Sequence, residues 1–353
     1  NSGLVAPGHF AFTNTLCVVS NEFGLGSSAT APMLLHIDNA SSVAANRTAY
    51  SPRFGSETGV FTNHVAIHFD TLFNLGSESM SERLVQDGDL HWIPKNTALN
   101  ALRMKGNFEM VHGKLDVDQH FYTSKADGYS GTPTWTFSGD SEMDIRLYIF
   151  GGGNEWFFDS DGKLSASQLC SGTYHFCREQ AFVNTMSPAP YSGSVYDLGG
   201  FDQEASLGDW TSSSRNERSA MGEITSETPA VLDVLESASI RANLTSIEWI
   251  TPFTGCAGLR KRGEASVVLS NVVGRASTST GLVAVAEGPL VFANTANWPN
   301  VSELSVEGGT MTIKAGALIN PNANLTISGG TLELEAGVEQ KVRRLEFDGR
   351  SCG

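Results

Sequence analysis

The chain has little positive charge and no long apolar run. It holds 23 Lys and Arg against 38 Asp and Glu among 353 residues, which gives a net charge of −15. A cationic groove for nucleic acid is therefore not expected. No stretch approaches the roughly 20 consecutive apolar residues that a membrane-spanning helix needs. We expect neither a nucleic-acid partner nor a membrane-spanning segment in this chain.

Motifs for cofactor binding and nucleophilic catalysis are also missing. No CxxC pair occurs, so zinc is not indicated. The glycine-rich residues 149–158 lack the Lys and Ser or Thr of a phosphate-binding loop, and no GxSxG elbow is present. We therefore expect no cofactor, with calcium as the one alternative considered below, and a chain that is not an enzyme.

Cysteine is scarce and odd in number, with five residues. Cys170 and Cys177 flank the phrase CSGTYHFC and are close enough in sequence for a disulfide that closes a small loop. Cys17, Cys256 and Cys352 have no partner that the sequence makes obvious. An odd count requires at least one free or intermolecular thiol if all the others pair.

A repeated phrase dominates the last part of the chain. Residues 304–313 and 325–334 read almost alike, and a third, partial copy starts at residue 345. Apolar residues alternate with polar ones, which predicts strands, and Gly-Gly-Thr divides each of the two full copies, where glycine permits a turn. The repeat positions are Leu304, Val306, Gly308, Gly309, Leu325, Ile327, Gly329, Gly330, Leu345, Phe347 and Gly349.

The spacing of these copies indicates a fold of stacked turns. A unit of about 20 residues cannot bury its apolar face alone, so neighbouring units must cover it. The leucine-rich repeat signature is absent, and a propeller blade needs about twice the length. The sequence therefore predicts an all-β protein, a parallel β-helix (β-solenoid), with Leu304 directly over Leu325. We expect regular solenoid repeats over residues 191–353. Residues 1–190 are expected to form a β-rich region of earlier, irregular rungs or a sandwich-like part.

Three segments carry a resemblance to a known family. Residues 196–208, 255–272 and 297–349 resemble the autotransporter-associated β-strand repeat of secreted passenger proteins. The resemblance implies a right-handed parallel β-helix that is exported to a cell surface or beyond, and it brings no catalytic motif. The chain departs from the family where Arg260, Lys261 and Arg262 replace a run of the type Thr-Lys-x-Gly-x-Gly-Thr.

Histidines in the phrase NHVAIHFD suggest a metal site. His64, His68 and Asp70 would share one face of a strand. Along an extended strand, however, His64 and His68 lie about 13 Å apart, too far to bind one ion. We favour ordinary outward-facing residues.

Aspartates at alternate positions suggest calcium instead. Asp116, Asp118 and His120 alternate within residues 114–121, as in aspartate ladders of calcium-dependent polysaccharide lyases, which also need a nearby base. The polar outer face of a half-buried strand is the interpretation we favour. Asp159, Asp161 and Gly162 suggest a calcium loop but lack its terminal Glu, so a hairpin turn is favoured there.

Two further clusters have a functional and a structural interpretation. The basic run at residues 260–262 suggests a phosphate site, but a short run of this kind is more typical of a solvated turn. Aromatic residues crowd residues 121–158, either as a sugar-stacking platform or as a thicker core, and we favour the core.

These observations predict a non-enzymatic extracellular or cell-surface β-solenoid that serves as a structural stalk, an adhesin or an assembly scaffold. Its expected partners are a protein that caps the open solenoid ends, a larger assembly, or surface glycans. The alternatives are a polysaccharide lyase or hydrolase, with its site near residues 100–120, and a carbohydrate-binding module. Because the sequence starts at Asn1 without a basic-then-apolar leader, we expect a mature product or a fragment of a longer precursor.

Overall fold

The computed structural model divides the chain into two compact units, Asn1–Tyr174 and His175–Gly353. Up to residue 124 it describes only the strands named below and Gly113, which lies between two of them. Beyond residue 124 it describes residues 134–160, 164–181, 193–206, 222–235, 246–272, 274–348 and 350–352. These residues form strands, turns and extended segments, and no helix occurs among them. The described part of the chain accordingly contains no helix long and apolar enough to cross a membrane.

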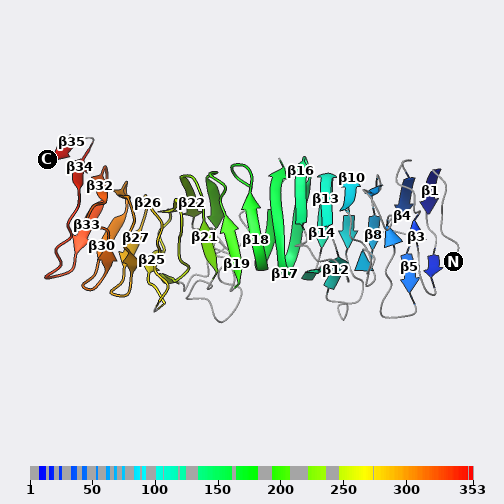
Figure 1. Cartoon of the computed structure of the whole chain (residues 1–353), viewed down its shortest axis with the longest axis horizontal. Coiled ribbons are helices and arrows are strands. Elements are labelled where there is room, and N and C mark those ends of the chain that lie inside the picture. Colours follow the sequence, from blue (N-terminus) through cyan, green and yellow to red (C-terminus); the bar gives the residue numbers. More distant parts are fainter. Residues whose placement is uncertain are drawn as a thin grey trace. The chain divides into compact units, whose positions relative to one another are not determined.

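Unit 1 consists of β-strands, most of which are short (Figure 1). They are β1 (Gly8–Phe12), β2 (Leu16–Val19), β3 (Gly24–Leu25), β4 (Met33–Ile37), β5 (Ser42–Ala45), β6 (Arg53–Phe54), β7 (Phe61–Asn63), β8 (Ile67–Phe69), β9 (Asn74–Leu75), β10 (Arg83–Asp87), β11 (Leu90–Trp92), β12 (Ala101–Lys105), β13 (Asn107–His112), β14 (Lys114–Val117), β15 (His120–Ser124), β16 (Thr134–Gly139) and β17 (Glu142–Ser160). β18 (Leu164–Phe176) starts in this unit.

The strands of unit 1 pair in parallel across successive turns of chain. β7, β10, β13 and β16 follow one another on one face, β8, β11 and β14 on a second, and β9, β12 and β15 on a third. The long strand β17 pairs with β14, β15 and β16, so it runs along all three faces. Each turn therefore adds one strand to each face, which is the architecture of a β-solenoid.

Aromatic side chains stack inside unit 1. Trp135 lies on Trp156 with ring centroids 5.1 Å apart, and Trp156 lies on Tyr174 at 5.6 Å. Phe137 and Phe158 form a second stacked pair at 5.6 Å. All five side chains are buried. Trp135, Phe137, Trp156 and Phe158, which belong to the aromatic cluster of residues 121–158, are thus core residues, as expected. Aromatic packing of this kind adds to the burial energy.

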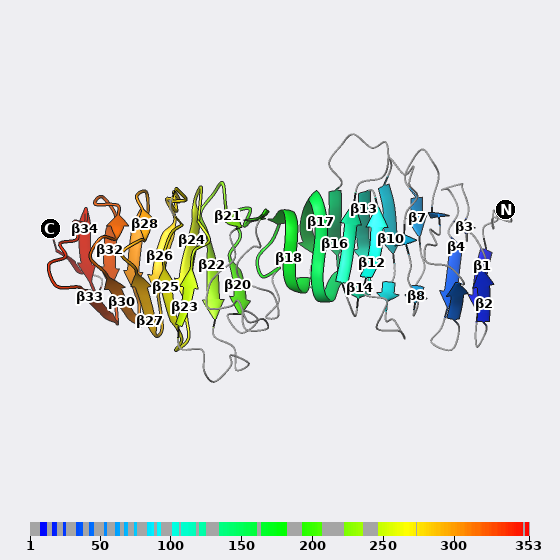
Figure 2. The ribbon, with the colours of Figure 1, turned by 90° about the horizontal axis from the view of Figure 1, so that it is seen from below.

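Unit 2 contains the remaining strands (Figure 2). They are β19 (Ser194–Asp197), β20 (Gln203–Ser206), β21 (Glu223–Thr225), β22 (Ala230–Leu235), β23 (Ser246–Trp249), β24 (Ala257–Lys261), β25 (Ser266–Leu269), β26 (Leu282–Val285), β27 (Pro289–Phe292), β28 (Asn297–Trp298), β29 (Glu303–Val306), β30 (Thr310–Ile313), β31 (Leu318–Ile319), β32 (Asn324–Ile327), β33 (Thr331–Leu334), β34 (Arg344–Phe347) and β35 (Arg350–Cys352).

Two sheets of parallel strands form the walls of unit 2. The first sheet has the order β20-β22-β24-β26-β29-β32-β34, and the second has the order β23-β25-β27-β30-β33. A short third wall includes the pair β28-β31. β35 is the exception, since it pairs antiparallel with β34. The predicted fold class, an all-β parallel solenoid, is confirmed.

The repeated phrase stacks in register, as the sequence predicts. Leu304 lies opposite Leu325, which lies opposite Leu345, and Val306, Ile327 and Phe347 align in the same way. We call the first row, extended toward the N-terminus, the aliphatic column. It comprises Leu232, Leu259, Val283, Leu304, Leu325 and Leu345. All of its members are buried except the last, which is half-buried. Burial of these side chains is the main source of stability in such a stack.

The paired glycines act through close approach rather than through unusual backbone angles. Gly308, Gly309, Gly329 and Gly330 are not among the residues with positive φ. A Cβ at Gly330 would overlap the carbonyl oxygen of Gly309, and a Cβ at Gly309 would overlap that of Gly288. The turns therefore nest directly on one another. The expectation that glycine permits a turn here that a Cβ would block is confirmed, because the missing side chain lets adjacent rungs pack. Gly349 lies outside the described residues.

Candidate functional site

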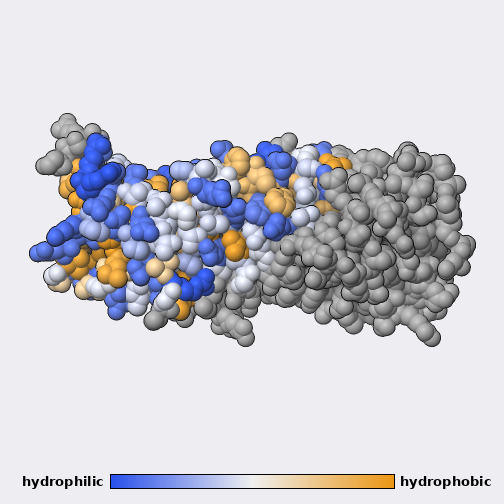
Figure 3. Space-filling view, viewed as in Figure 1, coloured by the Kyte–Doolittle hydropathy of each residue, from blue (hydrophilic) through white to orange (hydrophobic). Residues whose placement is uncertain are grey.

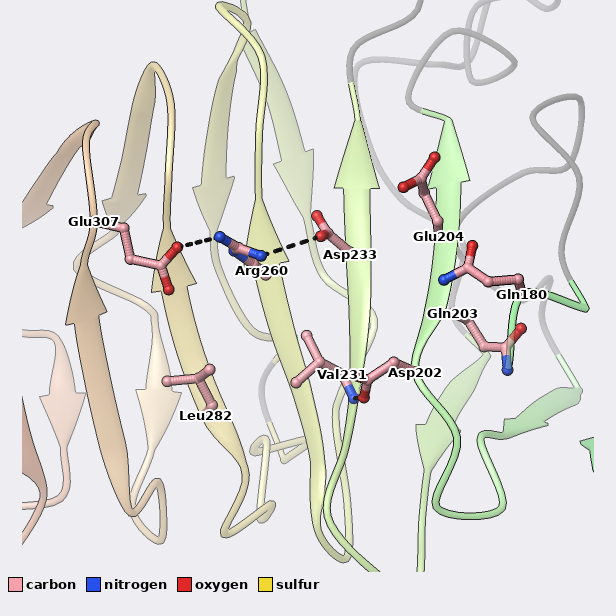
Figure 4. Close-up of a pocket in the computed structure, with 9 residues that line it drawn as sticks. All are labelled: Gln180, Asp202, Gln203, Glu204, Val231, Asp233, Arg260, Leu282 and Glu307. Carbon is pink, nitrogen blue, oxygen red and sulfur yellow. Dashed lines mark hydrogen bonds and ion pairs between the residues drawn. The ribbon is translucent and has the colours of Figure 1, made fainter. Parts of the chain in front are cut away.

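Charged side chains gather on the outer face of the first sheet of unit 2. The register places Glu204, Asp233 and Arg260 opposite one another on β20, β22 and β24, and Ala284 and Ser305 continue the row. Strand alternation turns Asp233 and Arg260 outward, because their neighbours Leu232 and Leu259 belong to the buried column, whereas Ala284 and Ser305 are covered. Parallel stacking thus brings together charges that are far apart in the sequence (Figure 4).

Arg260 lies between two carboxylates. Its Nη2 donates to Glu307 Oε2 at 2.5 Å, and its Nη1 lies 3.7 Å from Asp233 Oδ2. Glu307 follows β29, two strands away from β24 in the sheet. Ala284 occupies the position between Arg260 and Ser305 and is fully buried. Its small side chain leaves room for Arg260 to reach across β26.

Arg262 joins the other side of the row. Its Nε donates to Asp233 Oδ1 at 2.8 Å, and its Nη2 donates to Glu204 Oε2 at 2.7 Å. We call Glu204, Asp233, Arg260, Arg262 and Glu307 the charge network. It connects β20, β22, β24 and the turn after β29. Its members are 18–40% exposed, so each pair contributes at most about 1 kcal/mol, although sharing of partners lowers the entropy cost.

Burial and hydrogen bonding shift the pKa values of two members of the charge network. Desolvation raises the pKa of Asp233 above its ordinary value, outweighing the hydrogen bond from Arg262 and the charges of both arginines, and the charge of Glu204 adds to the rise. Burial works against the charged form of Arg262, but the hydrogen bonds to Asp233 and Glu204 outweigh it and raise its pKa. The guanidinium of Arg262 therefore stays charged, and burial disfavours the ionised form of Asp233.

Lys261 lies between the two arginines in sequence but points the other way. It aligns with Val234 on one side and Val285 on the other, within an inward-facing row, and its side chain is fully buried. The ammonium group donates to the carbonyl oxygen of Gly263 and, at 2.7 Å, to that of Glu287. The prediction of a solvated turn at residues 260–262 is therefore wrong. The three residues alternate between the charge network and the core because they lie at the end of strand β24.

The charge network borders a groove of about 340 Å³. Asp202, Glu204, Asp233, Glu307 and Arg260 supply its charged groups, and the side chains of Val231 and Leu282 supply apolar surface. Gln180 and Gln203 line the same end of the groove (Figure 4). Four carboxylates against one guanidinium leave a surplus of negative charge. Such a lining suits a ligand with hydroxyl or ammonium groups.

Gln203 has a structural role within this groove. Its side chain is fully buried and lies opposite Leu232, at the N-terminal end of the aliphatic column. Its Oε1 accepts from the N–H of Ala181 at 2.9 Å, and its Nε2 donates to the carbonyl oxygen of Arg178 at 2.7 Å. The amide therefore satisfies backbone groups where the column begins.

A second polar pair lies near the start of unit 2. His175 Nδ1 and Asp197 Oδ2 are 2.8 Å apart, and each side chain is about one quarter exposed. The hydrogen bond from His175 holds the pKa of Asp197 below its ordinary value, against the effect of burial, and the N–H of Gly199 at 3.0 Å lowers it further. Two residues from His175, the thiol of Cys177 lies 3.7 Å from the His175 carbonyl oxygen.

The cysteine prediction falls partly outside the described residues. Cys177 is half-buried and directly follows β18. Cys170 lies on β18, but its side chain is not among those that the structure describes. The structure therefore adds no support for the disulfide between Cys170 and Cys177, which stays a prediction.

The candidate metal ligands lie partly outside the described residues, and those that are described align across rungs. His64, Asp70, Asp118, Asp161 and Gly162 lie outside the described residues. The backbone of His68 lies opposite His91, and that of His91 lies opposite Asp116. Residues of a solenoid are brought together across rungs rather than along one strand. Among the side chains that the structure describes, no group of three or more His, Cys, Asp or Glu is placed to hold a metal ion.

Comparison with known proteins gives no match: no protein-family model, curated protein or solved structure is similar to this chain.

Proposed function

We propose that the chain is a structural β-solenoid of the cell surface or extracellular space, acting as a stalk or assembly scaffold. The observation that carries the proposal is the aliphatic column, which runs in register from β22 to β34. Each turn is stabilised by the turns on either side of it, so length can be built up by adding turns. Such an element holds other groups at a set distance.

The outer surface supports this role. Where the structure describes it, unit 2 presents a surface of mostly hydrophilic and intermediate residues with scattered apolar ones (Figure 3). The charge network links rungs along the outer face of the first sheet. A net charge of −15 favours solubility outside the cell. The resemblance of the repeats to secreted passenger proteins is a further reason to expect export.

Surface display is tested by labelling cells of the source organism with antibodies against residues 175–353. We expect intact cells or the culture medium to carry the label. Label that appears only after the cells are permeabilised would contradict the proposal. A cytosolic marker labelled in parallel controls for cell lysis.

The groove beside the charge network favours a second candidate function, the binding of a glycan. Its carboxylates and its guanidinium offer partners for hydroxyl groups, and the side chains of Val231 and Leu282 offer apolar contact. A glycan array with the intact chain tests this function. Hits should weaken in the variant Gln180→Ala, whose exposed side chain lines the groove. An array without hits, or hits that this variant leaves unchanged, would remove the candidate.

A further inference from the structure

Strand β33 has one open edge. Among the described residues it pairs with β30 and with no other strand. The N–H of Thr331 donates to Gly309 at 2.9 Å, and the N–H of Glu335 donates to Ile313 at 3.0 Å, both toward β30. Successive residues of a parallel strand direct their backbone groups to opposite sides. Leu332 and Leu334 therefore direct their N–H and C=O groups to the open edge.

The neighbouring sheet ends differently. β34 is followed by β35, which turns back and pairs antiparallel with it. The turn contains Asp348 in the left-handed region, with φ 46°. Hairpin pairing covers the edge of β34, whereas nothing in the described part of the chain covers the edge of β33. An uncovered edge is a template for a further strand.

The inward-facing rows of apolar side chains end at this edge, where the leucines of β33 are partly exposed. Leu332 follows Met311, and Leu334 follows Ile313, in the inward-facing rows of the second sheet. Ile313 is 1% exposed, whereas Leu334 is 44% exposed. Apolar colours reach the C-terminal end of unit 2 in Figure 3. A strand added here would bury two leucines in the same way that β33 buries Met311 and Ile313.

The negative charges of Glu333 and Glu335 determine which kind of strand fits the open edge. Glu333 lies between the two leucines and faces outward, where it accepts a hydrogen bond from the hydroxyl of Thr312 at 3.3 Å. Glu335 follows Leu334 directly. A strand opposite this pair gains from a basic residue between its two apolar residues. A second copy of β33 would instead bring two further carboxylates, so the edge disfavours pairing with itself.

We propose that the open edge of β33 binds one extended strand of another polypeptide, with apolar residues at two alternate positions and Lys or Arg between them. This mode of recognition is β-strand addition, in which main-chain hydrogen bonds supply affinity and alternate side chains supply specificity. The inference deepens the scaffold role proposed above, because it identifies how the scaffold holds a partner.

Fluorescent peptides titrated against the full chain test the proposal by anisotropy. The probe is acetyl-GGTLKLTAG-amide, with a Glu version and a scrambled version of the same composition as its references. We expect saturable binding of the Lys peptide, affinity about two- to fivefold weaker for the Glu peptide, and no saturation by the scrambled peptide. Equal binding of all three peptides would overturn the proposal.

Two variants locate the site. Leu332→Pro removes an edge N–H that β30 does not use, which an edge strand tolerates, and should abolish binding. Glu333→Lys, at an exposed position, should invert the preference from the Lys peptide to the Glu peptide. Leu318→Ser, which removes a 60% exposed leucine from β31, is the matched control and should leave affinity unchanged.

Three outcomes contradict the assignment. Binding that survives Leu332→Pro would exclude the edge, and an unchanged preference in Glu333→Lys would exclude the charge pairing. Self-association of the chain that Leu332→Pro abolishes would identify a second copy as the occupant instead. Failure of the peptides to bind leaves the antibody-labelling result unaffected, so the two proposals can fail separately.

Discussion

Lys261 is a charged residue in an otherwise apolar row. Its neighbours in register are Val234 and Val285, yet its ammonium group satisfies the carbonyl oxygens of Gly263 and Glu287 in two successive turns. A buried charge is tolerated only where hydrogen bonds replace the lost hydration. The side chain therefore packs as an aliphatic residue along its stem and holds the two turns together at its tip.

Replacement of this lysine by methionine should destabilise unit 2. Lys261→Met keeps the stem but removes the charged donor from the carbonyl groups of Gly263 and Glu287, which costs about 1–3 kcal/mol. Urea denaturation at pH 7 measures the effect. The exposed Lys314→Met serves as the control and should change the free energy of unfolding by less than about 0.5 kcal/mol. Equal stability of the Lys261 variant and the parent chain would show that the two hydrogen bonds contribute nothing.

We expect the carboxylate of Asp197 to make the stability of unit 2 depend on pH. Its pKa in the folded state lies below the ordinary value of 3.8, chiefly because of the hydrogen bond from His175. A lowered folded pKa contributes stability above the ordinary pKa, and this contribution is lost as the pH falls through the folded pKa. In Asp197→Asn the contribution is absent at every pH.

The difference in stability between the parent chain and Asp197→Asn should therefore be largest above about pH 5 and should shrink as the pH is lowered toward 3. Urea midpoints measured across this range check the expectation. A difference that stays constant with pH would mean that the ionised carboxylate is not responsible.

At the scale of the element, position in the stack decides what a leucine contributes. Leu304 on β29 has a rung on either side, with Val283 before it and Leu325 after it. Leu345 on β34 has Leu325 on one side and only the hairpin strand β35 on the other. The first is fully buried and the second is half-buried, although both occupy the same repeat position.

We therefore expect Leu304→Ala to cost about 2–5 kcal/mol in the free energy of unfolding, because it leaves a cavity inside the column. Leu345→Ala should cost less than about 1.5 kcal/mol, since its site is partly solvated and can collapse. Urea denaturation of both variants compares the two positions directly. Similar losses would show that the column is not the main source of stability.

The sheets also explain why the charge network stays in place. Its carboxylates and guanidinium groups sit on separate strands whose spacing is set by main-chain hydrogen bonds, so the side chains need little further ordering. Ala284 provides the gap that Arg260 crosses to reach Glu307. The network is thus a consequence of register, which the apolar rows determine.

At the scale of the molecule, unit 2 is a chain of equivalent turns, and stability is expected to be roughly additive over them. Residues 304 and 325 occupy the same place one turn apart. Deletion of residues 308–328 therefore removes one full turn and keeps Glu307 for the charge network. The following Gly329 and Gly330 take the places of Gly308 and Gly309.

This deletion should leave a folded unit 2, with a β-type circular dichroism spectrum and a single urea transition. Deletion of residues 308–325 is the matched control, because it removes less than a full turn and shifts every later strand out of register. We expect the control to lose the stacking of β33 and β34 and to unfold at lower urea concentration. Equal stability of the two deletions would contradict a structure built of interchangeable turns.

The sequence by itself determined the type of secondary structure, which is the β-strand, and the length of the repeat. Alternation around Leu304, its return around Leu325 and the paired glycines sufficed to predict parallel stacking, because a turn of this size must bury its apolar face on a like turn. The wrong inferences came from reading polar residues along one strand. Arg260, Lys261 and Arg262 were expected to be a solvated turn, yet two join carboxylates and one is buried.

Only the tertiary structure decided which polar residues meet. The partners of Arg260 and Arg262 lie on other rungs, far away in sequence, and Glu307 comes within reach only because Ala284 is small. The open edge of β33 likewise depends on β35 turning back onto β34. Apolar periodicity is a local property that a sequence displays, whereas contacts across rungs depend on turn lengths and register, which exist only once the coil has closed.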